Sequence, residues 1–135
     1  MPHRILIVDD NAAIRSLLRS LIEPQPEYQV CGEAENGEIA VHKVQELNPD
    51  IVILDLQMPV MDGLAAARHI ATVAPQTAML MLTMHATNQL YRLARAAGVK
   101  AVLSKTESVE QHLLAALRDI CPETRNMATP VNQGA

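Results

Sequence analysis

The sequence contains no Phe and no Trp, and its aromatic content is limited to two Tyr. An interior built from this composition has to be aliphatic, and Ala, Leu, Ile, Val and Met supply most of the 49% hydrophobic residues. At 135 residues, one domain can bury about two thirds of its unfolded surface, which is enough for a real core. Aromatic platforms for stacking bases are essentially missing, which disfavours single-stranded nucleic acid as a ligand.

Clustered basic residues are missing as well. The 11 Lys and Arg are outnumbered by 15 Asp and Glu, giving a net charge of -4. Nucleic-acid surfaces need clustered Lys and Arg, so we expect no direct nucleic-acid contact. The two cysteines, Cys31 and Cys121, have no metal-binding or CxxC spacing and are expected to be free thiols. No apolar run approaches the ~20 residues of a membrane span or suits a signal peptide, so we expect a cytoplasmic protein without membrane association.

Short apolar runs alternate with helical patterns, which is typical of repeated βα units, and five such units fit. The runs at 5–8, 51–54 and 79–82 are continuously apolar, as expected for parallel strands covered by helices on both faces. The runs at 28–31 and 100–103 are more mixed, which indicates edge strands. The pattern predicts one doubly wound α/β domain over residues 1–120, with the first, third and fourth strands in the centre. Residues 121–135 lack apolar periodicity and are expected to form a flexible tail or the start of a linker.

Helix boundaries have local causes in the sequence. Asn36-Gly37 and Asp62-Gly63 are predicted to open the second and third helices, and prolines are predicted to end helices at their C-termini. Thr106 or Ser108 is the candidate cap of the last helix. In the fourth helix, we expect the apolar positions to pack in the core; these are Leu90, Leu93, Ala94 and Ala97.

Polar residues follow the strand runs at the points where the strands are predicted to end. Asp9 and Asp10 follow the first run, Asp55 ends the third, Thr83 follows the fourth and Lys105 follows the fifth. Carboxyl ends of parallel strands share one edge of a sheet, so these side chains are expected to converge. Neighbouring carboxylates about 4 Å apart repel by ~4 kcal/mol at an effective dielectric near 20, so a cation must balance them. Lys105 supplies one positive charge, and Mg²⁺ suits the carboxylate oxygens.

An aspartate in such a site can attack phosphorus and form an acyl phosphate, with a lysine and a metal holding the phosphoryl oxygens. Asp55 is the candidate nucleophile, and the Thr83 hydroxyl can donate to one phosphoryl oxygen. The product adds about -1.5 to -2 charge, which can bias a two-state surface. The chemistry therefore predicts a phosphorylation switch.

The ordered set of Asp9-Asp10, Asp55, the Met58-Pro59-x-Met61-Asp62-Gly63 segment, Thr83 and Lys105 resembles the receiver domain of bacterial two-component response regulators over residues 4–120. The resemblance implies a flavodoxin-like five-stranded sheet in the order 2-1-3-4-5. It also implies roles for individual residues: Asp55 as phosphoacceptor, Asp10 as direct metal ligand, Asp9 as a ligand acting largely through water, Gln57 as a ligand through its backbone carbonyl, Thr83 as switch hydroxyl and Lys105 as phosphate-pairing lysine.

The same resemblance implies Mg²⁺ or Mn²⁺ as cofactor and a sensor histidine kinase or histidine phosphotransfer protein as phosphoryl donor. A homodimer formed on phosphorylation and an output domain outside this chain, such as a DNA-binding module, are further implied partners. The chain itself is expected to be a phosphoryl acceptor with at most slow autodephosphorylation, and not an enzyme.

Two positions depart from common receiver patterns. Val102 stands where many receivers carry a Tyr, Phe or His, and Thr106 stands where many carry a proline. Receivers joined to DNA-binding output domains often lack that proline. His85 is interpreted as a solvated loop histidine, although in receivers its position can influence attack of water on the acyl phosphate.

Three alternatives use the same residues. A metal-dependent phosphohydrolase with an aspartyl nucleophile should carry an acid two residues after that nucleophile, but position 57 is Gln. A flavodoxin-like electron carrier should bind a phosphate in its first loop, where Asp9 and Asp10 would repel it. A degenerate receiver that acts only as a binding module is disfavoured because every charged member of the site is present.

Overall fold

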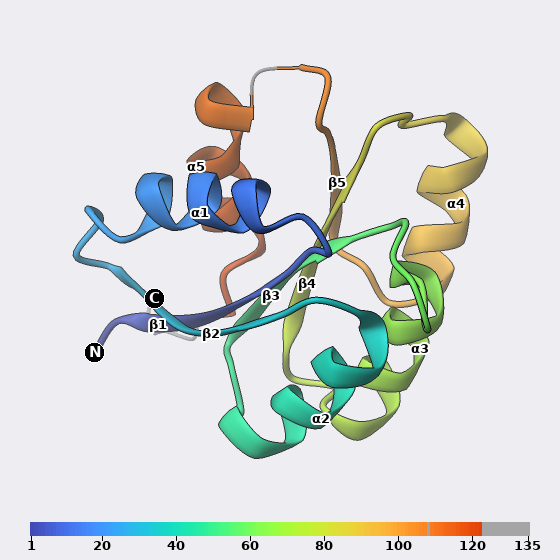
Figure 1. Cartoon of the computed structure of the whole chain (residues 1–135), viewed down its shortest axis with the longest axis horizontal. Helices are drawn as coiled ribbons and strands as arrows, with labels where there is room; N and C mark the ends of the chain where they lie inside the picture. Colours follow the sequence, from blue (N-terminus) through green and yellow to red (C-terminus); the bar gives the residue numbers. More distant parts are fainter. Residues whose placement is uncertain (108, 123–135) are drawn as a thin grey trace, which may run out of the picture.

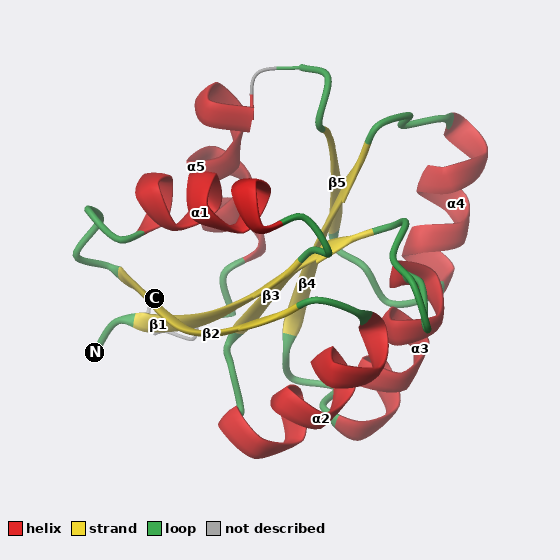
Figure 2. Ribbon diagram, viewed as in Figure 1, coloured by secondary structure: helices red, strands yellow, loops and turns green. Residues whose placement is uncertain are grey.

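The computed structural model describes residues 1–107 and 109–122, and in this part of the chain strands and helices alternate (Figures 1 and 2). The strands are β1 (His3–Val8), β2 (Tyr28–Ala34), β3 (Ile51–Asp55), β4 (Ala78–Thr83) and β5 (Ala101–Ser104). The helices are α1 (Ala12–Ile22), α2 (Gly37–Leu47), α3 (Gly63–Val73), α4 (Asn88–Ala96) and α5 (Val109–Ile120). The predicted tail beyond residue 122 and the candidate cap Ser108 lie outside the described residues.

The five strands form one parallel sheet in the order β2-β1-β3-β4-β5. This order confirms the flavodoxin-like fold class and the central placement of the three continuously apolar strands. Those strands are almost completely buried, because helices cover both of their faces. The sheet therefore carries its carboxyl ends along a single edge, where β1 and β3 are neighbours.

Figure 1 shows α1 and α5 on one face of the sheet and α2, α3 and α4 on the other. Successive side chains of a strand point to opposite faces, so each central strand contributes to two separate cores. In β1, Ile5 and Ile7 belong to the core that also includes residues of α1 and α5, whereas Leu6 and Val8 belong to the core that includes residues of α2, α3 and α4. The second of these cores uses many alanines, which lets three helices approach the same face.

β2 is longer than the predicted run at 28–31, because it continues to Ala34. The pairing with β1 shifts between Ile5 and Leu6, so that Val30 and Gly32 take consecutive partners and Cys31 is bulged out of register. The polar and small residues that follow the apolar run hid this extension from the sequence pattern. The extension matters for the site, since it places Glu33 and Ala34 beside the end of β1.

Side-chain caps begin four of the helices. Asn36 and Asp62 cap α2 and α3 as predicted, and each accepts a hydrogen bond from a backbone N–H two or three residues into its helix. Asn11 and Thr87 cap α1 and α4 in the same way. These caps fix where each helix starts relative to the strand end before it.

The prediction that Leu93 packs in the core was wrong. Leu90, Ala94 and Ala97 are buried, but Leu93 is 43% exposed, and Tyr91 on the same helix is 45% exposed. The buried stripe of this short helix is narrow, and Leu93 falls at its margin.

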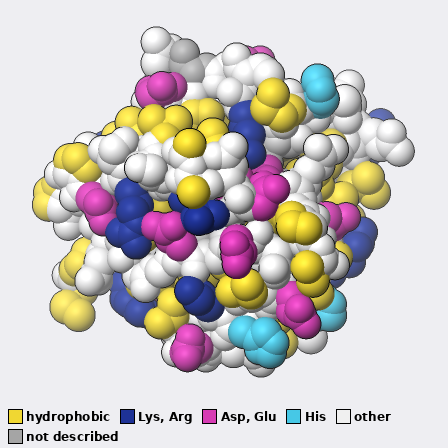
Figure 3. All heavy atoms as spheres, in the orientation of Figure 1, with side chains coloured by type: hydrophobic (Ala, Val, Ile, Leu, Met, Phe, Trp, Pro, Cys, Tyr) yellow, Lys and Arg dark blue, Asp and Glu magenta, His cyan; other side chains and the backbone are white. Residues whose placement is uncertain are grey.

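Side chains of both charge signs are interspersed with apolar ones on the face seen in Figure 3. Among the described residues, no helix combines the length and apolar character needed to cross a membrane.

Candidate functional site

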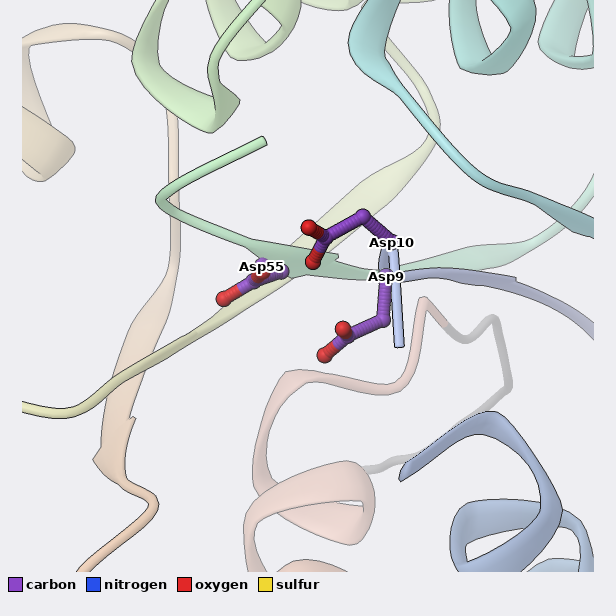
Figure 4. Close-up of side chains that lie close together, drawn as sticks. All are labelled: Asp9, Asp10 and Asp55. Carbon is purple, nitrogen blue, oxygen red and sulfur yellow. The ribbon is translucent and has the colours of Figure 1, made fainter. Parts of the chain in front are cut away.

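The ends of β1 and β3 carry the predicted acids to one place. Figure 4 shows the side chains of Asp9, Asp10 and Asp55 close together at the two strand ends. One oxygen from each carboxylate can be chosen so that all three lie within 4.8 Å of one another. Asp9 and Asp55 are 0% and 5% exposed, whereas Asp10 is exposed. The structure thus confirms the prediction that these three carboxylates lie close together.

Asp9 is fixed by its neighbours on several sides. Its backbone N–H donates to the carbonyl of Ala34 at 3.0 Å, which extends the β1–β2 pairing by one residue. Its Oδ1 accepts from the backbone N–H of Asn11 at 2.9 Å, and the Asn11 side chain in turn caps α1. The turn from strand to helix therefore holds the Asp9 carboxylate toward the pocket.

Lys105 joins the two buried carboxylates. Its Nζ lies 2.8 Å from Asp9 Oδ2 and 2.8 Å from Asp55 Oδ1, and its side chain is 14% exposed. The backbone N–H of Lys105 donates to the carbonyl of Thr83 at 2.7 Å, so the lysine is delivered by the pairing of β5 with β4. One ammonium thus sits between carboxylates that are 46 positions apart in the sequence.

The electrostatics of the pair follow from this burial. Burial raises the pKa of Asp55 above its ordinary value, the hydrogen bond from Lys105 works against that rise, and the negative charges of Asp9 and Asp10 add to it. Burial also disfavours the charged lysine, but hydrogen bonds to Asp55 and Asp9 outweigh it and raise the pKa of Lys105. The Lys105 ammonium therefore stays charged, whereas the contacts of Asp55 do not fully offset the cost of burying its negative charge.

A pocket of about 240 Å³ opens at this place. Its lining includes all of the predicted site residues together with three that the sequence interpretation did not select: Asn11, Ile14 and Met84. Asn11 and Met84 directly follow predicted site residues, and Ile14 lies in the first turn of α1, four residues after Asp10, so closeness in sequence was the available signal. The side chain of Gln57 is exposed at the rim.

Thr83 is buried at the end of β4, with 4% of its surface exposed. Its hydroxyl oxygen accepts from the backbone N–H of His85 at 3.3 Å, and His85 itself is exposed, in line with its interpretation as a solvated loop histidine. Met84 between them is 53% exposed. This long hydrogen bond from the His85 N–H to the Thr83 side chain thus links the connection between β4 and α4 to the pocket.

The connection that follows Asp55 is folded tightly onto the strand end. The backbone N–H of Gly63 donates to the carbonyl of Leu56 at 2.7 Å, and a Cβ on Gly63 would overlap the backbone carbonyl of Asp55. Val60 has a φ of 70°, an unusual value for a β-branched residue, and its side chain is 76% exposed. Met58 and Met61 pack against the core, which confirms their interpretation as structural residues.

This fold and site define the class of the protein: a flavodoxin-like α/β domain with an acidic pocket and a lysine at the carboxyl edge of its sheet. The family model of the response regulator receiver domain matches residues 5–118. The chain belongs to the response regulator receiver family and has the phosphoacceptor role of that family in two-component signalling. This membership favours the receiver over the phosphohydrolase and electron-carrier alternatives.

Individual relatives agree with the family match. The chain is 35% identical to Protein-glutamate methylesterase/protein-glutamine glutaminase 1 of Methanosarcina acetivorans, over 96% of this chain and 39% of that protein. It is 40% identical to the transcriptional regulatory protein YdfI of Bacillus subtilis, over 80% of this chain and 50% of that protein. The response regulator domain of Thermotoga maritima CheB has a TM-score of 0.84 and 29% identity, covering 89% of this chain and 96% of that one.

The prediction that the protein is not an enzyme is contradicted by these relatives. Several carry the name protein-glutamate methylesterase/protein-glutamine glutaminase, which is the name of an enzyme. The match spans 39% of the Methanosarcina acetivorans protein and 50% of the YdfI protein, so the chain covers half or less of these two relatives. The prediction rested on receiver residues alone, and such residues carry no information about the remainder of a longer protein.

Proposed function

We propose that Asp55 is the phosphoacceptor of this receiver and that Lys105 and Thr83 hold the phosphoryl group after transfer. The observation that carries this proposal is the position of Asp55. It ends a central strand at 5% exposure, its Oδ1 lies 2.8 Å from Lys105 Nζ, and it lines a pocket open to an incoming group. The Asp55 carboxylate is buried, its contacts do not fully offset the cost of burying its charge, and it is accessible from the pocket. These properties favour its reaction with a phosphoryl group that neighbouring cations hold.

In the proposed transfer, a carboxylate oxygen of Asp55 forms a bond to phosphorus while the bond between phosphorus and the donor's imidazole nitrogen breaks. The imidazole leaves with the bonding electron pair and takes up a proton from water. Lys105 then faces phosphoryl oxygens as well as a carboxylate, and its raised pKa keeps it charged throughout. We propose a sensor histidine kinase or a histidine phosphotransfer protein as the donor.

A divalent metal fits the residues present. Asp9, Asp10 and Asp55 would hold it together with the backbone carbonyl of Gln57, and these are the hard oxygen ligands that Mg²⁺ and Mn²⁺ prefer. When bound, such an ion neutralises charge on the transferring phosphoryl oxygens. Without it, Lys105 alone balances Asp9 and Asp55 while the exposed Asp10 has no charge partner within salt-bridge distance in the described residues.

The proposed output begins at Thr83. A phosphoryl group on Asp55 offers strong acceptor oxygens, and the Thr83 hydroxyl, whose oxygen now accepts from the His85 N–H, would reorient to donate to one of them. Because that contact ties the β4–α4 connection to the pocket, its change would move the start of α4. Val102, which is 9% exposed, supplies no aromatic ring to follow this movement, so the signal is proposed to pass through the connection itself.

The exposed Tyr91 and Leu93 on α4 are the proposed contact points for a partner, either a second copy on phosphorylation or an output domain of a longer protein. The relatives named as transcriptional regulator and methylesterase support the second of these partners. A cytoplasmic location, where a kinase could reach the site, belongs to the same proposal.

The test is intact mass spectrometry of the full chain after incubation with acetyl phosphate and Mg²⁺. We expect a gain of one phosphate in the native chain, loss of that gain with excess EDTA, and its removal by hydroxylamine, which cleaves acyl phosphates. Asp55→Asn should show no gain under any condition.

Asp62→Asn is the matched control, because Asp62 is a nearby exposed carboxylate and Asn also caps helices well. It should be phosphorylated like the native chain. Phosphate on Asp55→Asn, or its absence from the native chain, would contradict the assignment of Asp55.

A further inference from the structure

Arg15 lies in the first turn of α1 and reaches back to the end of β1. Its Nη1 donates to the backbone carbonyl of Asp9 at 2.6 Å, and its Nε donates to Glu33 Oε1 at 2.8 Å. The side chain is 18% exposed. A half-buried guanidinium thus bridges β2 and the loop that carries two of the three acids.

The carbonyl that Arg15 contacts belongs to the peptide unit joining Asp9 to Asp10. A peptide unit is planar, so holding its oxygen also fixes the direction in which the chain enters Asp10. The other polar groups of Asp9 already have partners: its N–H in Ala34, its Oδ1 in Asn11 and its Oδ2 in Lys105. Asp10 is exposed and has no such side-chain partner among the described residues, so its position depends on this peptide unit.

Arg15 is itself held in place from the other side. Glu33 accepts from Arg19 as well as Arg15, and the hydrogen bond from Arg19 keeps the pKa of Glu33 below its ordinary value despite partial burial. Lys43 donates to the backbone carbonyl of Glu33 at 2.6 Å. We call the contacts of Arg15 with Glu33 and with the Asp9 carbonyl the brace. The brace can form because β2 continues past the bulge at Cys31 as far as Ala34, beyond its apolar residues.

A cavity of about 280 Å³ beside these residues is lined by Arg15, Glu33 and Lys43 among others. Both cations on its wall already donate hydrogen bonds to protein oxygens. Binding an anionic ligand there would compete with those bonds. The arrangement is better suited to holding the β1–α1 loop than to taking a second ligand.

We infer that Arg15 is a positioning residue for the acidic pocket: it fixes the Asp9–Asp10 peptide unit against β2 so that the two carboxylates meet Asp55 in a geometry suited to a divalent cation. This inference rests on the proposed function, because it concerns the proposed metal ligands. Groups that orient metal ligands without touching the metal commonly change affinity by about 10- to 100-fold when they are removed.

Arg19 offers a matched control. It pairs with the same Glu33 and also with Glu23, yet among the described residues none of its hydrogen bonds or ion pairs reaches Asp9. If these arginines only contribute surface ion pairs, removing either one should affect the pocket equally little. If Arg15 positions the loop, only its removal should affect metal binding.

The experiment is isothermal titration of the full metal-free chain with Mg²⁺ alone, comparing native, Arg15→Met, Arg15→Lys and Arg19→Met. We expect Arg15→Met to raise the dissociation constant about tenfold or more, Arg15→Lys to restore part of the affinity, and Arg19→Met to stay within about twofold of native. Thermal unfolding of the same metal-free samples reports general stability. An equal loss of affinity in Arg15→Met and Arg19→Met, or no loss in Arg15→Met, would overturn the inference.

Two further samples separate this inference from the proposed function. Asp10→Asn should weaken Mg²⁺ binding by removing a ligand, and if the native chain binds Mg²⁺ no better than Asp10→Asn, the proposed metal site fails rather than the role of Arg15. Should Arg15→Met not fold, Glu33→Gln replaces it: a weakened affinity supports the brace, since Glu33 supports Arg15 without touching Asp9, and an affinity equal to that of the native chain counts against it.

Discussion

The interior of the sheet and its carboxyl edge both contain fully buried side chains, but different forces hold the two regions together. Leu80 in the interior and Asp9 at the edge are both 0% exposed. Burying a leucine side chain stabilises a fold by about 1.5–3 kcal/mol through the loss of apolar surface, whereas burying a carboxylate costs free energy unless partners compensate it. At the edge that compensation comes from Lys105, which pairs with both Asp9 and Asp55, and from the backbone N–H of Asn11, which donates to Asp9.

The difference explains why the two regions respond differently to change. The interior depends on volume and shape, so any residue of similar size and polarity keeps most of the packing. The edge depends on a small number of specific contacts, and each of them comes from a different strand end. We therefore expect the interior to determine the stability of the fold. The edge is expected to be less stable because its buried charges form a site that can accept a phosphoryl group.

The largest effect on stability is expected from a cavity in the interior. Leu80→Ala removes a fully buried side chain from the core beneath α1 and α5 and should lower the free energy of unfolding by about 2–5 kcal/mol. Urea denaturation of the full chain measures this loss. Leu93→Ala, at a position 43% exposed on α4, should change it by less than about 0.5 kcal/mol. Similar losses in both variants would show that the interior is not the source of stability.

A smaller loss of stability is expected at Gly63, where the backbone after β3 packs directly against the backbone of Asp55. Gly63→Ala places a Cβ onto the Asp55 carbonyl and should cost about 1–3 kcal/mol while displacing the loop that follows β3. Gly32→Ala is the control, because its Cβ would meet side-chain ends and no backbone: Leu47 at 2.8 Å, which can move, and Leu6 at 3.5 Å, an ordinary contact. Urea denaturation gives the two costs, and a greater cost at Gly32 would argue against tight packing at the edge.

The smallest effect should appear in the pH dependence of stability. Burial raises the pKa of Asp55, so the folded chain binds this proton more readily than the unfolded chain does. The resulting stability is complete below the unfolded pKa, near pH 4, and is lost as the pH rises through the folded pKa. Asp55→Asn should therefore raise the melting temperature of the metal-free chain at pH 7, and this gain should shrink as the pH approaches 4.

Thermal unfolding in EDTA across this range tests the sign of the effect. Lys105 keeps Asp9 as a partner in the variant, so loss of Asp55 does not leave the ammonium buried alone. Asp62→Asn removes a carboxylate outside the pocket and serves as the control. A lower melting temperature of Asp55→Asn at pH 7 would mean that the pair with Lys105 outweighs the cost of burying Asp55.

The sequence predicted the regions that follow local rules. Continuously apolar runs marked β1, β3 and β4 as central strands, because burial on both faces requires an apolar residue at every position. Asn36 and Asp62 marked the starts of α2 and α3 through their capping chemistry. The predicted site residues were found because they lie at or just after the ends of the strand runs, and the parallel pairing of the strands then brings them to one edge.

Features that depend on the path of a neighbouring strand or helix could not be predicted from the sequence. The extension of β2 to Ala34 follows a bulge opposite β1, and the exposure of Leu93 follows from how narrowly α4 meets its neighbours. Arg15 and Glu33 are 18 positions apart and carry no motif, so their link to Asp9 could not be read from spacing.

By itself, then, the sequence determined the alternation of elements, the central strands and the identity of the residues at the strand ends, since hydrophobic periodicity and capping act over a few neighbouring residues. Only the tertiary structure decided that Lys105 lies between Asp9 and Asp55, that Asp10 is exposed beside them, and that Arg15 braces their loop. These arrangements depend on distances between segments far apart in the chain, and such distances are set by how the strands pair and how the helices pack on them.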